Sequence, residues 1–173
     1  MQKTITVNSL PFNSIKTYAV ASMFIAANII LPQTVHLFPG GGHIWLPIYL
    51  FTLVGAYVFG WRVGIITALA SPLINSIFGM PPVDALPSIL MKSVLLGVFA
   101  GYASEKFRKV SVSKLAIVVL AYQTIGTLGE WAISGSFEYA SADFRMGIPG
   151  MLLQIFGGLA IIKALTSKTT DRL

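Results

Sequence analysis

Hydrophobic residues fill six blocks of the chain, and polar residues gather in the short stretches between them. Within a block, the hydrophobic positions follow neither the two-residue period of a half-buried strand nor the one-sided period of a water-facing helix. Blocks of this length are typical of helices surrounded by lipid or by one another. We therefore predict an all-α integral membrane protein, a bundle of six transmembrane helices at about residues 14–31, 45–60, 63–78, 86–103, 114–134 and 147–165.

The composition agrees with this class of protein. Of the 173 residues, 55% are hydrophobic and 10% are charged, whereas soluble chains carry about 25% charged residues. A fairly polar stretch precedes the first block and no cleavage pattern follows it, so we expect an uncleaved first helix and one membrane domain over residues 1–173. The absence of cysteine excludes disulfides, thiol catalysis and thiolate metal sites.

Local signals suggest where some helices begin and end. Asn13 or Ser14 can cap the first helix, and Pro32 is expected to stop it. The second and third helices are joined only by residues 60–62, which predicts a tight hairpin. Each of these two helices has 16 residues and reaches only ~24 Å, which is short of a ~30 Å hydrocarbon core. Either the bilayer thins at this place or protein shields the helix ends. Pro72 is expected to kink or unwind the third helix.

The basic residues indicate the orientation. If the N-terminus is inside the cell, Arg145 is the only basic residue in the outer loops, and Lys92 lies within a helix. This asymmetry follows the positive-inside rule, so we predict a bacterial inner-membrane protein with both termini in the cytoplasm and no nucleic-acid partner. The remaining basic residues, all placed on the inner side, are Lys3, Lys16, Arg62, Lys106, Arg108, Lys109, Lys114, Lys163, Lys168 and Arg172.

Polar residues within the helices concentrate toward the outer end. At helical rise, Asn75 lies ~5 Å, Glu130 ~6 Å, Lys92 ~9 Å and Gln154 ~10 Å from the outer ends of their helices. Polar groups in a membrane interior face protein or water and require partners, because burying an ionisable group there costs ~2.5–3.5 kcal/mol. We therefore predict a substrate pocket in the outer half, lined by the third to sixth helices and roofed by the outer loops.

Each candidate residue has a structural alternative. Lys92 could extend its stem to the interface or pair with Glu130 to tie two helices, and Asn75 and Gln154 could hydrogen-bond between helices. A ligand contact from Lys92 would favour a ligand with a carboxylate or another acceptor, although Glu130 leaves a zwitterion or a polar neutral heterocycle open.

The outer loops supply further candidates. Trp45, Trp131 and Tyr139 could stack on a ligand or belong to the aromatic belt at the membrane interface. Gly40, Gly41 and Gly42 predict either a mobile lid or a plain flexible connector. His43 is a candidate ligand contact, but its spacing from His36 matches no metal-binding pattern, and we predict no metal site and no cofactor.

Ala19, Ser22 and Ala26 share one face of the first helix. Small residues let another membrane helix approach closely. This face predicts either a docking surface for another subunit or packing against the helices of the chain itself.

The segments Ala19–Ala27, HLFPGGGHIWLPIYL, GAYVFGWRVGIITALASPLINSIFGMPP and LPSILMKSVLLGVFAGYAS resemble the substrate-binding (S) components of energy-coupling factor (ECF) transporters. The resemblance implies a six-helix membrane subunit that captures a vitamin or related micronutrient outside the cell. It also implies docking, through small residues at Ser22 and Ala26, on a membrane coupling (T) protein that carries two cytoplasmic ATPases. Here the pair is Ser-x-x-x-Ala rather than the usual Ala-x-x-x-Ala.

Two other functions remain open from the sequence. A solitary ion-coupled transporter would commonly show inverted repeats and broken helices. The sequence shows no convincing repeat, and Pro72 is the one position that suggests a broken helix. A membrane enzyme would need paired catalytic groups in one pocket, but Glu130 is the only carboxylate within a predicted helix. Because the chain has no nucleotide-binding loop, ATP hydrolysis would occur on partner subunits.

Overall fold

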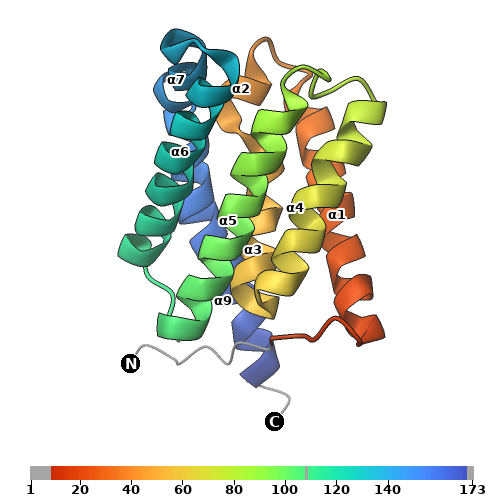
Figure 1. Ribbon diagram of the computed structural model, residues 1–173. Coiled ribbons are helices and arrows are strands. Elements are labelled where there is room, and N and C mark those ends of the chain that lie inside the picture. The colour runs from red at the N-terminus through yellow and green to blue at the C-terminus, as the bar shows by residue number, and fades with distance from the viewer. Residues whose placement is uncertain (1–8, 108, 171–173) are drawn as a thin grey trace.

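The computed structural model describes residues 9–107 and 109–170, and every regular element in these ranges is a helix. The long helices run side by side, and the short helices α2 (Gly41–Trp45) and α7 (Phe137–Met146) lie together at one end (Figure 1). Of the basic residues predicted on the inner side, Lys3, Arg108 and Arg172 and the side chain of Lys168 lie outside the described residues.

Four helical segments in the described ranges are long and apolar enough to cross a membrane. They are α1 (Ile15–Val35), α5 (Leu86–Phe107), α6 (Val112–Ser134) and the segment Ile148–Ser167. The last segment consists of α8 (Ile148–Leu152), the π-helical turn η2 (Leu153–Gly157) and most of α9 (Gly158–Thr170). These four segments coincide with the first, fourth, fifth and sixth predicted helices.

The second and third predicted helices are also helical, but they are shorter. The turn η1 (Pro47–Tyr49) leads into α3 (Leu50–Phe59), and Gly60 separates α3 from α4 (Trp61–Ile77). Eight of the ten residues of α3 are buried, because α1, α4, α5 and α9 pack around it. The short α3 is therefore surrounded by protein. This agrees with the alternative in which protein, and not a thinner bilayer, accommodates a helix of this length.

Glycines bring α4 and α5 into close contact. A Cβ atom on Gly97 of α5 would lie 3.1 Å from the carbonyl carbon of Gly64 on α4, and one on Gly101 would lie 2.5 Å from Cα of Trp61. Gly64 in turn packs on α3, where an added Cβ would lie 2.5 Å from Cβ of Ala56. Such small residues allow helices to pack closely where no hydrophobic force drives their association.

The prediction that Pro32 stops the first helix is wrong. Pro32 lies inside α1, which continues to Val35. A proline leaves the carbonyl four residues earlier without its helical donor, and here Asn75 of α4 replaces that donor, with its Nδ2 2.9 Å from the Asn28 carbonyl oxygen. Pro72 likewise lies within a continuous α4, so the expected unwinding does not occur.

Two of the stretches predicted as outer loops are partly helical. Residues 135–146 contain α7, which begins after Ser136, whose hydroxyl accepts a hydrogen bond from the Tyr139 backbone N–H. In the first loop, Gly40 adopts a φ of 71° and precedes α2, so Gly41 and Gly42 are helical. A side chain on Gly41 would meet Val35, and one on Gly42 would meet His36. These glycines therefore permit close packing of α2 on the end of α1.

One face of α1 is left uncovered by the other residues that the structure describes. Ala19, Ser22 and Ala26 are exposed, together with the large side chains of Ile15, Met23 and Ile30. The alternative in which the small-residue face packs against helices of the same chain is therefore wrong.

Candidate functional site

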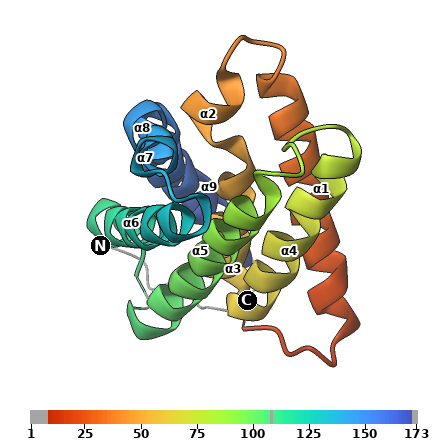
Figure 2. The ribbon, with the colours of Figure 1, turned by 45° about the horizontal axis from the view of Figure 1, so that its top comes forward.

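A cavity of about 380 Å3 lies at the end of the molecule that carries α2 and α7. This end comes forward in Figure 2, where α2 lies beside α7 and α8. Residues from the end of α1, from α2, η1, α5, α6 and α7, and from the connection between α4 and α5, surround the cavity. They are Pro32, His36, Gly42, His43, Leu46, Pro47, Ile48, Tyr49, Met80, Pro81, Pro82, Ala85, Ile89, Glu130, Tyr139, Ala142, Asp143 and Met146.

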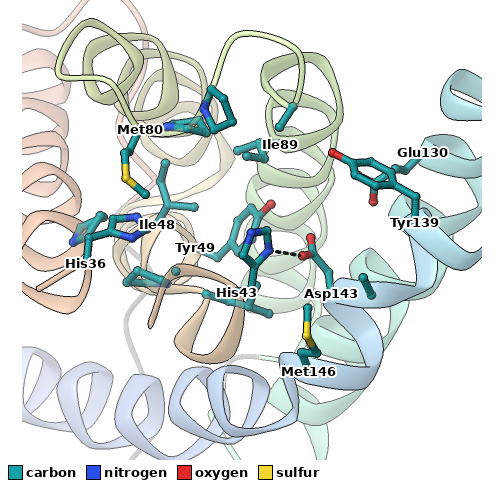
Figure 3. A pocket seen from close by; sticks show the side chains of 18 residues that line it. His36, His43, Ile48, Tyr49, Met80, Ile89, Glu130, Tyr139, Asp143 and Met146 are labelled. Atoms are coloured by element: carbon teal, nitrogen blue, oxygen red, sulfur yellow. Dashed lines mark hydrogen bonds and ion pairs between the residues drawn. The ribbon is translucent and has the colours of Figure 1, made fainter. Parts of the chain in front are cut away.

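The two sides of the cavity differ in chemistry. Ile48, Met80 and Ile89 give one side an apolar surface, and Figure 3 shows Glu130, Tyr139 and Asp143 across from them. A concave, mostly apolar site with a few convergent polar groups is the usual form of a small-molecule pocket.

A network of charged side chains lies at the polar side. Lys92 of α5 places its Nζ 2.5 Å from Glu130 Oε2 and 2.8 Å from Asp143 Oδ2. The Asp143 contact is a hydrogen bond, whereas the Glu130 contact is an ion pair in which Oε2 has no aligned donor. On the other Asp143 oxygen, His43 Nδ1 lies 3.4 Å from Oδ1 (Figure 3). The network therefore links α2, α5, α6 and α7.

Gly126 of α6 makes room for the lysine. A Cβ atom on Gly126 would lie 2.5 Å from Cγ of Lys92, so only glycine lets the lysine stem pass across α6 toward the carboxylates. Lys92 is fully buried, which contradicts the alternative in which its stem reaches the interface. Lys92 and Glu130 do pair between two helices, and Glu130 also lines the cavity.

The groups at the rim of the cavity influence one another. Burial alone would raise the pKa of Asp143, but the contact with His43 and the charge of Lys92 outweigh it and lower that pKa below its ordinary value. The hydrogen bond to Asp143 raises the pKa of His43 although partial burial opposes it. Two effects lower the pKa of His36: its partial burial, which is the larger, and the nearby charge of His43.

These shifts define the pH window in which His43 and Asp143 hold α2 against α7. The raised pKa of His43 means that its stabilising contribution is complete below pH 6.5 and is lost as pH rises through the folded-state value. The lowered pKa of Asp143 means that its contribution is present above pH 3.8 and is lost in stronger acid. The contact is therefore strongest in mildly acidic solution.

We expect the two histidines to titrate on opposite sides of 6.5, with His43 above it and His36 below it. The Asp143→Asn variant removes the carboxylate charge and should lower the pKa of His43. The measurement is the imidazole NMR shift of the detergent-solubilised protein against pH, with His36→Gln to assign the signals. A pKa of His43 that Asp143→Asn leaves unchanged would contradict the contact.

Four of the predicted site residues come together here. Glu130, Tyr139 and His43 line the cavity, and Lys92 lies behind it in contact with both carboxylates. Gly42 also contributes to the lining, whereas Gly40 and Gly41 do not.

The other four predicted residues do not line the cavity. Asn75 is buried and donates to the carbonyl oxygens of Asn28 and Ser71, so it ties α1 to α4. Gln154 is buried in η2, where its Oε1 accepts a hydrogen bond from the Tyr122 hydroxyl at 2.9 Å. For both residues the structure therefore supports the interhelical alternative.

Trp45 and Trp131 are about half exposed, and neither lines the cavity. Trp131 packs edge-on against Phe137, with ring centroids 5.4 Å apart. This position suits the interfacial-belt alternative better than stacking on a ligand in the cavity.

Asp143 and Tyr49 are lining residues that sequence reasoning missed. A helical signal for Asp143 exists, since Tyr139, Asp143 and Met146 follow one another at spacings of four and three, which places them on one helix face. All three line the cavity. Reading residues 135–146 as a loop concealed this face. Tyr49 gave no such signal, because it lies within an almost continuous apolar run.

Comparison with known proteins identifies a family. The family model described as "ECF transporter, substrate-specific component" matches residues 16–167, which is most of the chain and includes every residue of the charged network. No curated protein and no solved structure matches the chain.

Proposed function

Because this chain belongs to the substrate-specific components of ECF transporters, we propose that it captures a vitamin or related micronutrient for ATP-driven import by a separate coupling module. The observation that carries the proposal is the cavity of about 380 Å3 at one end of the helical bundle. Its volume falls within the range of about 300–1,000 Å3 that small-molecule sites occupy.

The basic side chains support an orientation in which the cavity opens outward. Lys16 and Lys114 lie in the first turns of α1 and α6, Lys106 lies in the last turn of α5, and these helix ends are opposite α2 and α7 (Figure 1). Positive charge favours the cytoplasmic side. We infer six membrane-spanning segments, with η1–α3 and α4 as the two short ones and both termini in the cytoplasm of a bacterial inner-membrane protein.

The short helices α2 and α7 form the cover of the proposed site. The pair of His43 on α2 and Asp143 on α7 joins the two parts of the cover. Ligand entry requires this contact or a neighbouring one to open, and a ligand favours closure only as far as it binds the closed state more tightly. Gly40, with its left-handed backbone, is the candidate hinge of this lid.

The exposed face of α1 suits the coupling (T) protein, whose two cytoplasmic ATPases would supply the energy. Ala19, Ser22 and Ala26 lie on this face without cover from the rest of the described chain. A partner helix could approach these small residues closely, and this assignment agrees with the small-residue docking motif that the family resemblance implies.

The test of ligand capture is native mass spectrometry of gently purified protein. We expect the wild type to retain a small molecule and the Ala142→Trp variant to lose it, because Ala142 lines the cavity and an indole would fill much of it. Ala132→Trp is the matched control, since Ala132 is exposed on α6 and does not line the cavity. Equal retention by all three proteins would contradict capture in this cavity.

Dependence on a coupling module is tested separately in cells. Uptake of the retained molecule should stop in cells that lack every coupling protein. Uptake that continues in those cells would instead indicate a solitary transporter.

A further inference from the structure

We propose that the ligand carries a positively charged, hydrogen-bond-donating group that binds between Glu130 and Asp143. This inference rests on the proposed function and specifies the ligand class of the same cavity. It follows from the charge balance of the site, from the capacity of Glu130 to accept a further hydrogen bond and from the residues that line the rest of the cavity.

The charge balance favours a cation. Lys92 supplies one positive charge, whereas Glu130 and Asp143 supply two negative charges, so these three groups leave an excess of one negative charge. Among the described residues that line the cavity, only His43 and His36 can add positive charge. The Asp143 contact favours the protonated form of His43, and the negative excess is uncompensated once His43 loses its proton at higher pH. A ligand cation would compensate it within a partly buried site, where charge pairing is stronger than in water.

Lys92 is not available to an anionic ligand. Its ammonium is fully buried and lies within 2.8 Å of both carboxylates. An anion would have to approach past Glu130 and Asp143, which line the cavity in front of the lysine. A ligand carboxylate was expected only if Lys92 contacts the ligand directly. Because both carboxylates already surround Lys92, that expectation no longer has support.

Glu130 retains capacity to accept a hydrogen bond. The residue is 6% exposed and lines the cavity, while its buried Oε2 faces the Lys92 ammonium. An ionised carboxylate offers about four acceptor positions on two oxygens, and the Lys92 contact engages Oε2 alone, so the other oxygen remains able to accept. An ammonium, amidinium or protonated ring N–H would supply both the donor and the charge.

The remaining lining describes the body of the ligand. Ile48, Met80, Ile89 and Met146 provide apolar contacts, and Tyr139 lies beside Glu130 in Figure 3. An aromatic ring next to a cation site adds attraction to positive charge. The expected ligand is therefore a small molecule with an apolar or heteroaromatic body and a cationic group at one end.

The experiment uses the small molecules of a rich growth medium, separated by ion exchange at pH 7 into cationic, neutral and anionic fractions. The retained small molecule is first removed from the purified full-length protein by prolonged washing in detergent. Each fraction is then added to this emptied protein, and thermal unfolding is followed. We expect the cationic fraction to give the largest increase in Tm, because a ligand that binds only the folded state stabilises it.

The outcomes separate the two proposals. An equal or larger increase with the neutral or anionic fraction overturns the cationic ligand while leaving capture intact. No increase with any fraction overturns capture itself, and the ligand class with it.

Variants test the position of the cation. Glu130→Gln should weaken binding of the active cationic component by about tenfold or more, the equivalent of about 1.4 kcal/mol. Glu138→Gln is the matched control, because Glu138 is exposed on α7 and does not line the cavity. Asp143→Asn repeats the test at the second carboxylate if Glu130→Gln does not fold. Unchanged binding in a folded carboxylate variant overturns the placement.

Discussion

Replacing Lys92 with methionine is expected to lower the free energy of unfolding by about 3–5 kcal/mol, as found when one partner is removed from a buried ion pair. The substitution leaves Glu130 and Asp143 close together without the ammonium that now lies between them. The measurement is thermal or denaturant-induced unfolding in detergent. Lys163→Met is the matched control, because Lys163 is exposed on α9.

A triple variant separates the loss of charge pairing from the loss of packing. Adding Glu130→Gln and Asp143→Asn to Lys92→Met removes all three charges, and we expect this variant to be more stable than Lys92→Met alone. Such non-additive recovery is the signature of residues that interact. A triple variant less stable than Lys92→Met, or a Lys92→Met protein as stable as Lys163→Met, would contradict the network.

Replacing Gly97 with leucine is expected to lower the free energy of unfolding by about 1–3 kcal/mol, because a large side chain would be forced into a closely packed contact. Backbone atoms of Gly64 lie 3.1–3.2 Å from the place of a Cβ on Gly97, so α4 and α5 must separate. α5 also carries Lys92, so the same variant should weaken ligand retention.

The neighbouring position provides the control for Gly97→Leu. Val98 is exposed on α5, and Val98→Leu adds volume without entering the contact with α4. We expect its unfolding temperature to match the wild type. If the two variants unfold at the same temperature, the close approach of α4 and α5 does not contribute to stability.

The helices could be predicted from the sequence because long apolar blocks have few other structures available to them. The predictions that failed depended on contacts between distant residues. Pro32 is accommodated in α1 only because Asn75, 43 positions later, donates to the carbonyl that the proline leaves free. No local signal at Pro32 contains that information.

The candidate site could be predicted only in part for a related reason. Distance from the helix end correctly placed Lys92 and Glu130 near the end of the bundle that holds the cavity, but position along a helix does not specify which helix face a residue occupies. Trp131 follows Glu130 directly and still points elsewhere, because consecutive residues of an α-helix differ by about 100°. Asn75 and Gln154 lie at similar depths and hydrogen-bond within the bundle. Asp143 was missed because α7 was read as a loop.

The position of Lys92 along the chain has a consequence for biogenesis. Lys92 is synthesised before Glu130 and Asp143, and the only acidic residue that precedes it in the chain is Asp84. While α5 enters the bilayer, its ammonium therefore lacks both of its eventual partners. The ion pairs can form only after α6 and α7 have left the ribosome, so completion of membrane assembly at this step depends on segments that follow α5 in the chain.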